Sequence, residues 1–295
     1  MEAGGRMTGS SAGSAPRPPS ERALPGKAVP IEAAPVEGSD GTVLLAVADG
    51  VARVTLNRPD KRNAMDARVV AGLRSALEAT ASSKDVRVVL LRGAGPDFCS
   101  GADLAALEAL ADAGAEASLE DARQMGDLFV AMRRHPRPIV AAVTGRALAG
   151  GCGLATACDM ILASEDARFG FPEVHLGFVP AMVMTMLRRK VVEGRAFELV
   201  TLGERIDAAE ACRVGLVNRV FAPEDFEAGV EEVVGSLAAR PASAIHLTKR
   251  LLYGLDGVAF EDGIGRGAEV NTVARLTEAC RAGVRAFLDR SPSRS

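Results

Sequence analysis

Short apolar runs alternate with longer amphipathic stretches over much of the chain, after a polar beginning. Runs typical of buried strands cover residues 42–47, 51–56, 86–91, 138–143 and 160–163. The first two flank Ala48-Asp49-Gly50, and an Asp-Gly turn between two apolar runs predicts a β-hairpin. Helical spacing covers residues 66–81, with Asp66 as N-cap, and residues 120–134. Strands that alternate with helices predict βαβ units and a mostly parallel sheet.

The pattern changes to helices from Pro180 onward. Predicted helices cover residues 181–191, 195–201, 208–214, 223–239, 242–252, 259–273 and 276–289, with one short strand at 217–221. Residues before about Asp40 are rich in Gly, Ser, Ala and Pro and show no hydrophobic periodicity. We therefore predict a disordered N-terminal tail over 1–41, an α/β core over 42–220 and a helical C-terminal part over 221–295.

The composition excludes several classes of protein. The net charge of −3 over 295 residues gives no electrostatic case for nucleic-acid binding. No apolar run approaches the roughly 20 residues of a membrane helix, and the tail lacks the apolar stretch of a secretory signal. The five cysteines and three histidines show no metal-ligand spacing, so we expect neither a metal site nor a disulfide framework. We expect a cytoplasmic protein whose cysteines are mostly small core residues.

Two junctions of small residues follow predicted strands. One covers residues 93–104, where Asp103 is a natural N-cap, and the other covers residues 144–155 around Gly150 and Gly151. A strand that feeds such a turn and then a helix points free backbone N–H groups at whatever lies above the turn. Glycines there let a ligand oxygen approach the main chain closely. Such a junction suits a phosphate, a carboxylate or a developing oxyanion, and a plain tight turn with close helix packing is the alternative.

Four motifs, in one order, carry a resemblance to a known family. They are Asn57-Arg58-Pro59, Phe98-Cys99-Ser100-Gly101-Ala102-Asp103-Leu104, Ala147-Leu148-Ala149-Gly150-Gly151-Cys152-Gly153-Leu154-Ala155 with Cys158-Asp159, and Phe169-Gly170-Phe171-Pro172-Glu173-Val174-His175-Leu176-Gly177. From about Val43 to Asp289 the sequence resembles the crotonase superfamily of enoyl-CoA hydratases and isomerases. The resemblance implies the crotonase fold, an α/β spiral of ββα units with a helical C-terminal part, usually in homotrimers or dimers of trimers. It also implies an acyl-CoA substrate and no separate cofactor, because coenzyme A is part of the substrate.

The resemblance also assigns roles to residues. The backbone N–H groups of Ala102 and Gly150 would form an oxyanion hole for the thioester enolate, each worth about 3 kcal/mol, with Glu173 as the acid or base. Coenzyme A would bind along Ala102, Asp103, Leu104, Ala105, Gly150 and Gly151. Phe287 and Arg290 match the aromatic and basic residues that reach the coenzyme A of a neighbouring subunit. An amphipathic helix with one buried aromatic residue is the alternative for that segment.

One position departs from the family pattern. Well-studied hydratases use two glutamates, and Glu173 matches the second, whereas the first position is Gly153. Hydration in which both carboxylates hold the water cannot run unchanged, although some hydratases resembling the methylglutaconyl-CoA group also carry Gly there. We predict an enoyl-CoA hydratase-like enzyme for an unsaturated acyl-CoA, with branched chains among the candidates. A double-bond isomerase that uses Glu173 alone and a non-catalytic acyl-CoA-binding protein are the alternatives.

Residues around Glu173 also have plainer interpretations. A glutamate after a proline at a turn is usually solvated, whereas an apolar pocket would raise its pKa toward neutrality and suit proton transfer. His175 would share a face with Glu173 if the segment is extended, but a hydrogen-bonded structural histidine is the plainer interpretation. Four further residues either reshape the acyl pocket or pack as ordinary helix core: Met182, Val183, Met184 and Met186.

Overall fold

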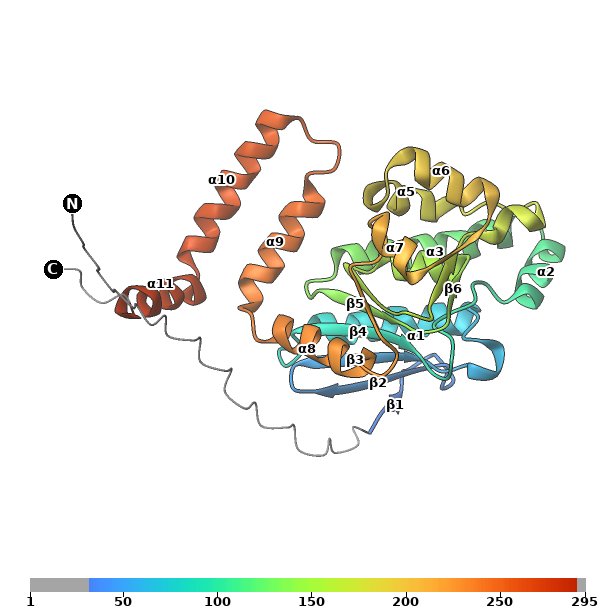
Figure 1. Cartoon of the computed structure of the whole chain (residues 1–295), viewed down its shortest axis with the longest axis horizontal. Coiled ribbons are helices and arrows are strands. Elements are labelled where there is room, and N and C mark those ends of the chain that lie inside the picture. The colour runs from blue at the N-terminus through green and yellow to red at the C-terminus, as the bar shows by residue number, and fades with distance from the viewer. Residues whose placement is uncertain (1–31, 291–295) are drawn as a thin grey trace, which may run out of the picture. The chain divides into compact units, whose positions relative to one another are not determined.

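The computed structural model describes residues 32–290, and a seven-stranded sheet is its centre (Figure 1). The strand order is β1-β2-β3-β4-β5-β7-β10. The hairpin of β2 (Val43–Ala48) and β3 (Val51–Leu56) is antiparallel around the Asp-Gly turn, as predicted. From β3 onward all neighbours are parallel, through β4 (Val88–Gly93), β5 (Ile139–Val143), β7 (Met160–Ser164) and β10 (Arg219–Phe221). The predicted, mostly parallel α/β sheet is therefore confirmed.

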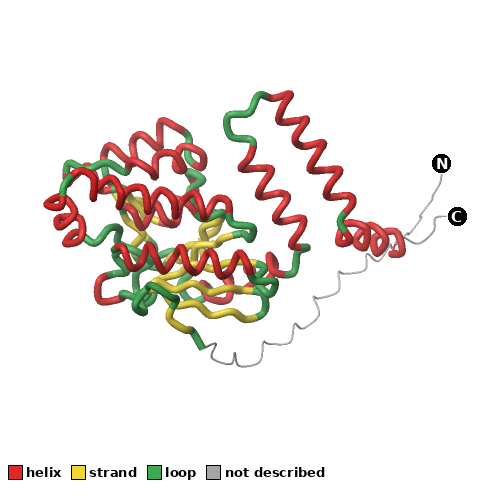
Figure 2. The backbone as a smooth tube through the Cα atoms, turned by 180° about the vertical axis from the view of Figure 1, so that it is seen from behind, coloured by secondary structure: helices red, strands yellow, loops and turns green. Residues whose placement is uncertain are grey.

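Helices cover both faces of this sheet, because its central strands are apolar on both sides. Helices α1 (Ala67–Ser82) and α3 (Ala115–Arg134) lie along one face of the sheet (Figure 2). On β4, Val89 and Leu91 join the core that these helices form. Val88 and Leu90 point to the other face and pack with α8 (Phe226–Ala238). Since α8 packs directly on the sheet, residue 220 marks a change of secondary structure and does not end the α/β core.

A second, three-stranded sheet corrects the prediction for the junction at residues 144–155. It consists of β6 (Arg146–Leu148), β8 (Arg168–Gly170) and β9 (Arg205–Asp207). The sequence predicted that the strand at 138–143 feeds the glycine turn directly, but β6 intervenes before α4 (Gly150–Ala157). Strand β6 forms because it pairs in parallel with β8, a strand too short to show a periodic pattern.

The predicted helices from Pro180 onward lie within a few residues of their predicted ranges. They are α5 (Ala181–Lys190), α6 (Glu193–Leu202), α7 (Ala208–Arg213), α9 (Ala242–Gly254), α10 (Phe260–Leu276) and α11 (Glu278–Arg290). Helix α2 (Leu104–Ala113) follows the predicted N-cap Asp103. Three short elements were not predicted: β1 (Ala34–Pro35), η1 (Pro59–Lys61) and η2 (Pro172–Leu176). The predicted N-cap Asp66 accepts hydrogen bonds from the N–H groups of Arg68 and Val69. Three of the five cysteines are buried, in line with a core role.

Ordered structure begins before the predicted boundary at residue 42. Strand β1 pairs antiparallel with β2, and Val36 and Ser39 are buried. The Ser39 hydroxyl donates to the carbonyls of Val36 (2.7 Å) and Val43 (3.1 Å). The polar composition of this segment predicted disorder, but its polar groups form hydrogen bonds within the segment and with β2. Residues 1–31 of the predicted tail lie outside the described residues.

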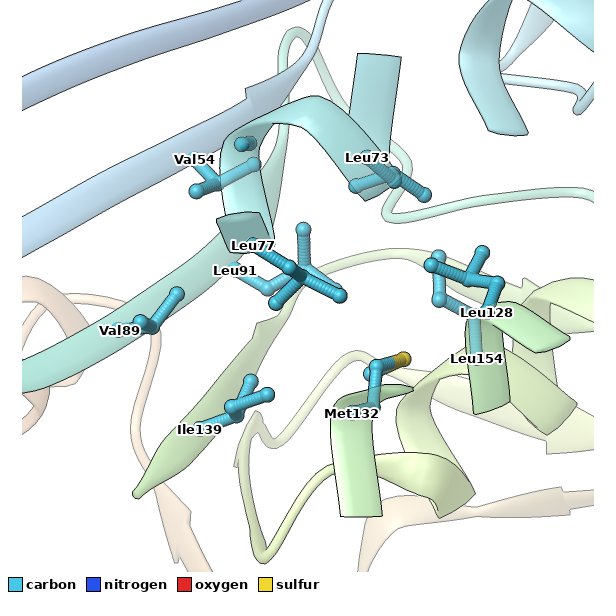
Figure 3. A pocket seen from close by; sticks show the side chains of 10 residues that line it. Val54, Leu73, Leu77, Val89, Leu91, Leu128, Met132, Ile139 and Leu154 are labelled. Carbon is cyan, nitrogen blue, oxygen red and sulfur yellow. The ribbon is translucent and has the colours of Figure 1, made fainter. Parts of the chain in front are cut away.

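A small apolar cavity lies between α1, α3 and the sheet (Figure 3). Its volume of about 10 Å³ is at the lower limit for a single water molecule. The lining side chains are Leu, Val, Ile, Met and Ala, which offer a water no hydrogen-bond partner. This cavity is therefore a feature of core packing and not a ligand site.

A buried ion pair fastens α9 to the sheet. The Asp159 carboxylate accepts from Lys249 Nζ (2.7 Å), from the Tyr253 hydroxyl (2.7 Å) and from the Ile139 N–H (2.6 Å). Only 8% of Lys249 is exposed, and burial lowers its pKa. A second link joins Asp256 near the end of α9 to Arg133 and Arg189.

Replacing Lys249 is expected to destabilise the protein strongly. Lys249→Ala leaves the Asp159 carboxylate without its cation, and breaking a buried pair on one side costs about 3–5 kcal/mol. Urea unfolding followed by circular dichroism measures this loss. Lys61→Ala, at an exposed lysine, is the matched control, with an expected change within about 0.5 kcal/mol. Equal stabilities of the two variants would contradict the structural role of the pair.

Candidate active site

Two backbone turns touch where the two glycine junctions meet. Cys99 forms a parallel bridge with Ala147. A Cβ placed on Gly101 would lie 2.9 Å from the Cβ of Ala149 and 3.5 Å from the backbone nitrogen of Gly150. A Cβ on Gly151 would lie 2.2 Å from a backbone oxygen. Glycine is needed at these positions because the two main chains are in contact.

The contact brings together the two predicted N–H donors. The Met65 N–H donates to the Gly101 carbonyl (2.8 Å), and the Asp103 N–H donates to the Met65 carbonyl (2.8 Å). Successive N–H groups of an extended segment point to opposite sides, so the Ala102 N–H points away from Met65. Gly150 begins α4, and its N–H has no partner within the helix. No carbonyl in the described part of the chain accepts from either group.

The two donors are also close in space. A Cβ built on Gly150 would lie 3.9 Å from the Ala102 nitrogen and 3.1 Å from Met65 Cε. The half-buried Gly150 and the exposed Ala102 therefore lie side by side at the surface of the turn. Sequence reasoning assigned no role to Met65, although it forms the bridge that orients the Ala102 N–H.

Backbone strain at Ala149 sets the direction of the Gly150 N–H. Ala149 has φ +51° and ψ −129°, a conformation that favours glycine. Such a residue costs about 1–3 kcal/mol and persists only where the surroundings hold it. Its N–H donates to the Gly170 carbonyl (2.9 Å), and its carbonyl accepts from the Gly153 N–H (3.0 Å). Both bonds hold the first turn of α4 in this orientation.

Glu173 is a buried carboxyl close to α4. It lies in η2, three residues after Gly170 at the end of β8. Only 7% of Glu173 is exposed, and its Oε2 has no hydrogen-bond partner among the described residues. Burial raises its pKa above the usual range. Burial raises the pKa of the Cys152 thiol to about 12, and the nearby Glu173 charge adds to this shift.

Arg58 explains why the Asn57-Arg58-Pro59 motif accompanies this site. Its guanidinium pairs with Asp103 (3.0 Å) and Asp66 (3.3 Å) and donates to the Ala64 carbonyl. The hydrogen bond from Arg58 is the main reason that the pKa of Asp103 lies below its usual range. Arg58 therefore fixes the turn at Ala102 to the preceding loop. Its place in a motif was the only sequence signal for this role.

His175 has a structural position. The segment is a 3₁₀ helix and not extended, so His175 does not share a face with Glu173 as an extended chain would require. The side chain is exposed, with Nε2 3.3 Å from the Gly203 carbonyl oxygen. The plainer interpretation of this histidine is confirmed.

The space at position 153 is filled from another helix. A Cβ on Gly153 would lie 2.4 Å from Val183 Cγ2, and Val183 on α5 is 4% exposed. Met182 lies toward α3, with Sδ 3.5 Å from a Cβ built on Gly126. Of the four residues considered for the acyl pocket, Val183 is the one that fills the side-chain space at position 153.

The predicted coenzyme A residues occupy different surfaces. Leu104 and Ala105 begin α2 and are exposed, next to the Ala102 turn. Phe287 is 72% exposed on α11, which contacts α9 and α10, and Arg290 is the last residue of α11. The contact of Phe287 and Arg290 with a neighbour's coenzyme A stays a prediction.

A hollow of about 280 Å³ lies elsewhere, between α9 and the carboxyl ends of α4 and α5. It is lined by Arg133, Arg189, Lys190 and Asp256, among others. Helix α4 separates it from Gly150 by about 12 Å, the length of eight helical residues. Among the described residues no group of three His, Cys, Asp or Glu side chains is placed to hold a metal ion. Nor is any described helix long and apolar enough to cross a bilayer.

Comparison with known proteins identifies the family. The sequence pattern of the Enoyl-CoA hydratase/isomerase family matches residues 46–293. A Thermus thermophilus relative from the enoyl-CoA hydratase group is 40% identical over 248 residues, covering 83% of this chain and 96% of that protein. The 2,3-dehydroadipyl-CoA hydratase of Escherichia coli is 35% identical, covering 80% and 91%. The crystal structure of an enoyl-CoA hydratase from Mycobacterium smegmatis superposes with a TM-score of 0.81 at 32% identity, covering 84% and 96%.

The chain belongs to the enoyl-CoA hydratase/isomerase (crotonase) superfamily, and its α/β core with C-terminal helices is the crotonase fold. This confirms the resemblance carried by the four motifs. Two relatives, from mouse and rat, are named as mitochondrial proteins. The cytoplasmic location expected from the sequence therefore stays a prediction.

Burial of the Glu173 carboxyl predicts a pH dependence of the protein's stability. The pKa of Glu173 is higher in the folded state than in the unfolded state, so between these two pKa values the folded state binds more protons. The contribution of Glu173 to the free energy of unfolding therefore falls as the pH rises through this range. Glu173→Gln removes the cost of burying a charge. We expect a higher Tm than wild type at pH 8 and a smaller difference near pH 4, measured by calorimetry. A difference that does not vary with pH would contradict the burial argument.

Proposed function

We propose that this protein is an enoyl-CoA hydratase that uses Glu173 as its single acid/base group. The buried carboxyl of Glu173, whose Oε2 has no partner among the described residues and which lies near the first turn of α4, carries the proposal. The backbone N–H groups of Ala102 and Gly150 are the proposed oxyanion hole. Two donors that lie close together, with no carbonyl partner in residues 32–290, suit an oxygen that gains charge in the transition state.

In the proposed reaction, Glu173 takes a proton from water as the water oxygen bonds to C3 of the enoyl group. The C2–C3 π electrons move onto the thioester oxygen, where the two N–H groups stabilise the enolate. The enolate then takes the proton back from Glu173 at C2 and restores the thioester. One carboxyl completes the cycle, provided that its pKa lies near the working pH.

The named reactions of two relatives favour hydration over isomerisation. The Escherichia coli protein is named for hydration of 2,3-dehydroadipyl-CoA, and a Syntrophomonas wolfei relative, 34% identical over 213 residues, is named a crotonyl-CoA hydratase. The single carboxylate favours the second candidate, a double-bond isomerase. There Glu173 would take a proton from C2 of a 3-enoyl-CoA and return it at C4.

Glu173→Gln tests both reactions. We expect kcat to fall about 10²–10⁴-fold with crotonyl-CoA or a 3-enoyl-CoA, because the amide cannot exchange the proton. Product mass distinguishes hydration, which adds one water, from isomerisation, which leaves the mass unchanged. Glu165→Gln, at an exposed glutamate eight residues earlier in the chain, is the control and is expected to keep wild-type activity.

Two results would contradict the proposal in different ways. Unchanged turnover in Glu173→Gln would remove this residue from the mechanism. Tight coenzyme A binding by the wild type without turnover of any enoyl-CoA would favour a non-catalytic acyl-CoA-binding protein.

We also propose that the chain assembles into a homotrimer or a dimer of trimers. Helix α10 has no buried residue, and apolar side chains are exposed along α9–α11. They include Leu252, Phe260, Ile264, Val273, Leu276 and Val284. An apolar surface of this kind is typical of an interface between subunits.

The mass of the full-length protein in solution tests the assembly. We expect three or six times the chain mass of 30.6 kDa by light scattering. Ile264→Glu, in the second turn of α10, is expected to shift the mass toward that of one chain. An unchanged oligomer in this variant would contradict a role for α10 in assembly.

A further inference from the structure

Helices α4 and α5 meet without a gap at position 153. A side chain there would begin 2.4 Å from Val183 Cγ2, well inside the distance that two carbon atoms tolerate. Val183 is 4% exposed and has little freedom to move aside, since valine in a helix has one strongly preferred χ1 rotamer. The missing side chain at Gly153 and the presence of Val183 in its place are therefore one structural feature.

This feature lies on the side of α4 that begins with Gly150. Residues three apart in a helix share a face, so position 153 lies one turn beyond the Gly150 N–H. Cys152, next to Gly153, is close enough to Glu173 for the carboxylate to raise its thiol pKa. Val183 therefore presents methyl groups one helical turn from the proposed oxyanion hole.

We propose that Val183 is a wall of the acyl pocket and selects the acyl chain by closing the space at position 153. The inference rests on the proposed function, since it places the acyl group of the substrate beside α4. The wall is apolar, so it accepts hydrocarbon and excludes a second carboxylate from this turn. Trimming Val183 opens room for a branch on the acyl chain, and a side chain at position 153 takes that room away again.

Binding of saturated acyl-CoA esters tests the wall without relying on catalysis. The probes are butyryl-CoA and 3-methylbutyryl-CoA, which differ by one methyl branch, titrated into the full-length protein by calorimetry. In Val183→Ala we expect the preference for the branched over the linear ester to rise about 10-fold, because one methylene in an apolar pocket is worth at least this much. In the double variant Gly153→Ala/Val183→Ala we expect it to return to within about 3-fold of wild type.

Thermal unfolding tests the contact itself. Gly153→Ala alone is expected to lower Tm by about 2–6 °C, since overpacking outweighs the gain in helix propensity. In the Val183→Ala background the same change is expected to raise Tm. The control is Leu187→Val, one turn further along α5 in the core, which lowers stability but leaves the branched-to-linear ratio unchanged.

Several outcomes overturn the inference. One is a branched-to-linear ratio in Val183→Ala within 2-fold of wild type, and another is an unchanged Tm in Gly153→Ala. A third is a shifted ratio in Leu187→Val equal to that in Val183→Ala, which would show a general loosening. If the wild type binds both esters but turns over no enoyl-CoA, the proposed hydration activity is contradicted. The branched-to-linear binding ratio then still tests the role of Val183. Lack of any acyl-CoA binding would overturn the proposed function and the inference with it.

Discussion

The close approach of two main chains is the constraint on which the rest of this structure depends. Gly101 and Gly151 have no side chain because the opposing turn occupies that volume, down to 2.2 Å for a Cβ at Gly151. Gly101 lies three residues before α2 and Gly151 lies in the first turn of α4, and the first turn of a helix leaves backbone N–H groups without a partner in the helix. Buried side chains determine where the strands lie. The missing side chains of Gly101 and Gly151 let the two turns touch, and this contact determines where the proposed N–H donors lie.

Several local rules are broken at one place, and this is typical of functional sites. Ala149 adopts a conformation that favours glycine, Glu173 has a buried oxygen with no partner in the described part of the chain, and Gly153 lies inside a helix. Each of these features costs stability. The surrounding sheet, covered by helices on both faces, supplies the stability that offsets them.

Periodicity predicted the long elements well, because each buries one continuous apolar face. It missed β8 and β9, which have three residues each and pair only through tertiary contacts. The proposed donor roles of Ala102 and Gly150 came from the family resemblance carried by the motifs. The contacts of Met65 and Arg58 depend on bridges and ion pairs between distant segments, which no motif shows. The filling of position 153 by Val183 was also beyond sequence reasoning, since it requires the packing of α5 on α4.

The short strand β1 has a consequence for solubility. It lies outside β2 at the margin of the seven-stranded sheet, and its second residue, Pro35, has no N–H to offer a further strand. The margin therefore ends in a segment that is a poor template for pairing with another molecule. A chain that started at residue 42 would instead expose the unpaired backbone of β2, which could pair with the edge of another molecule and cause aggregation. In the full-length protein β1 covers this edge.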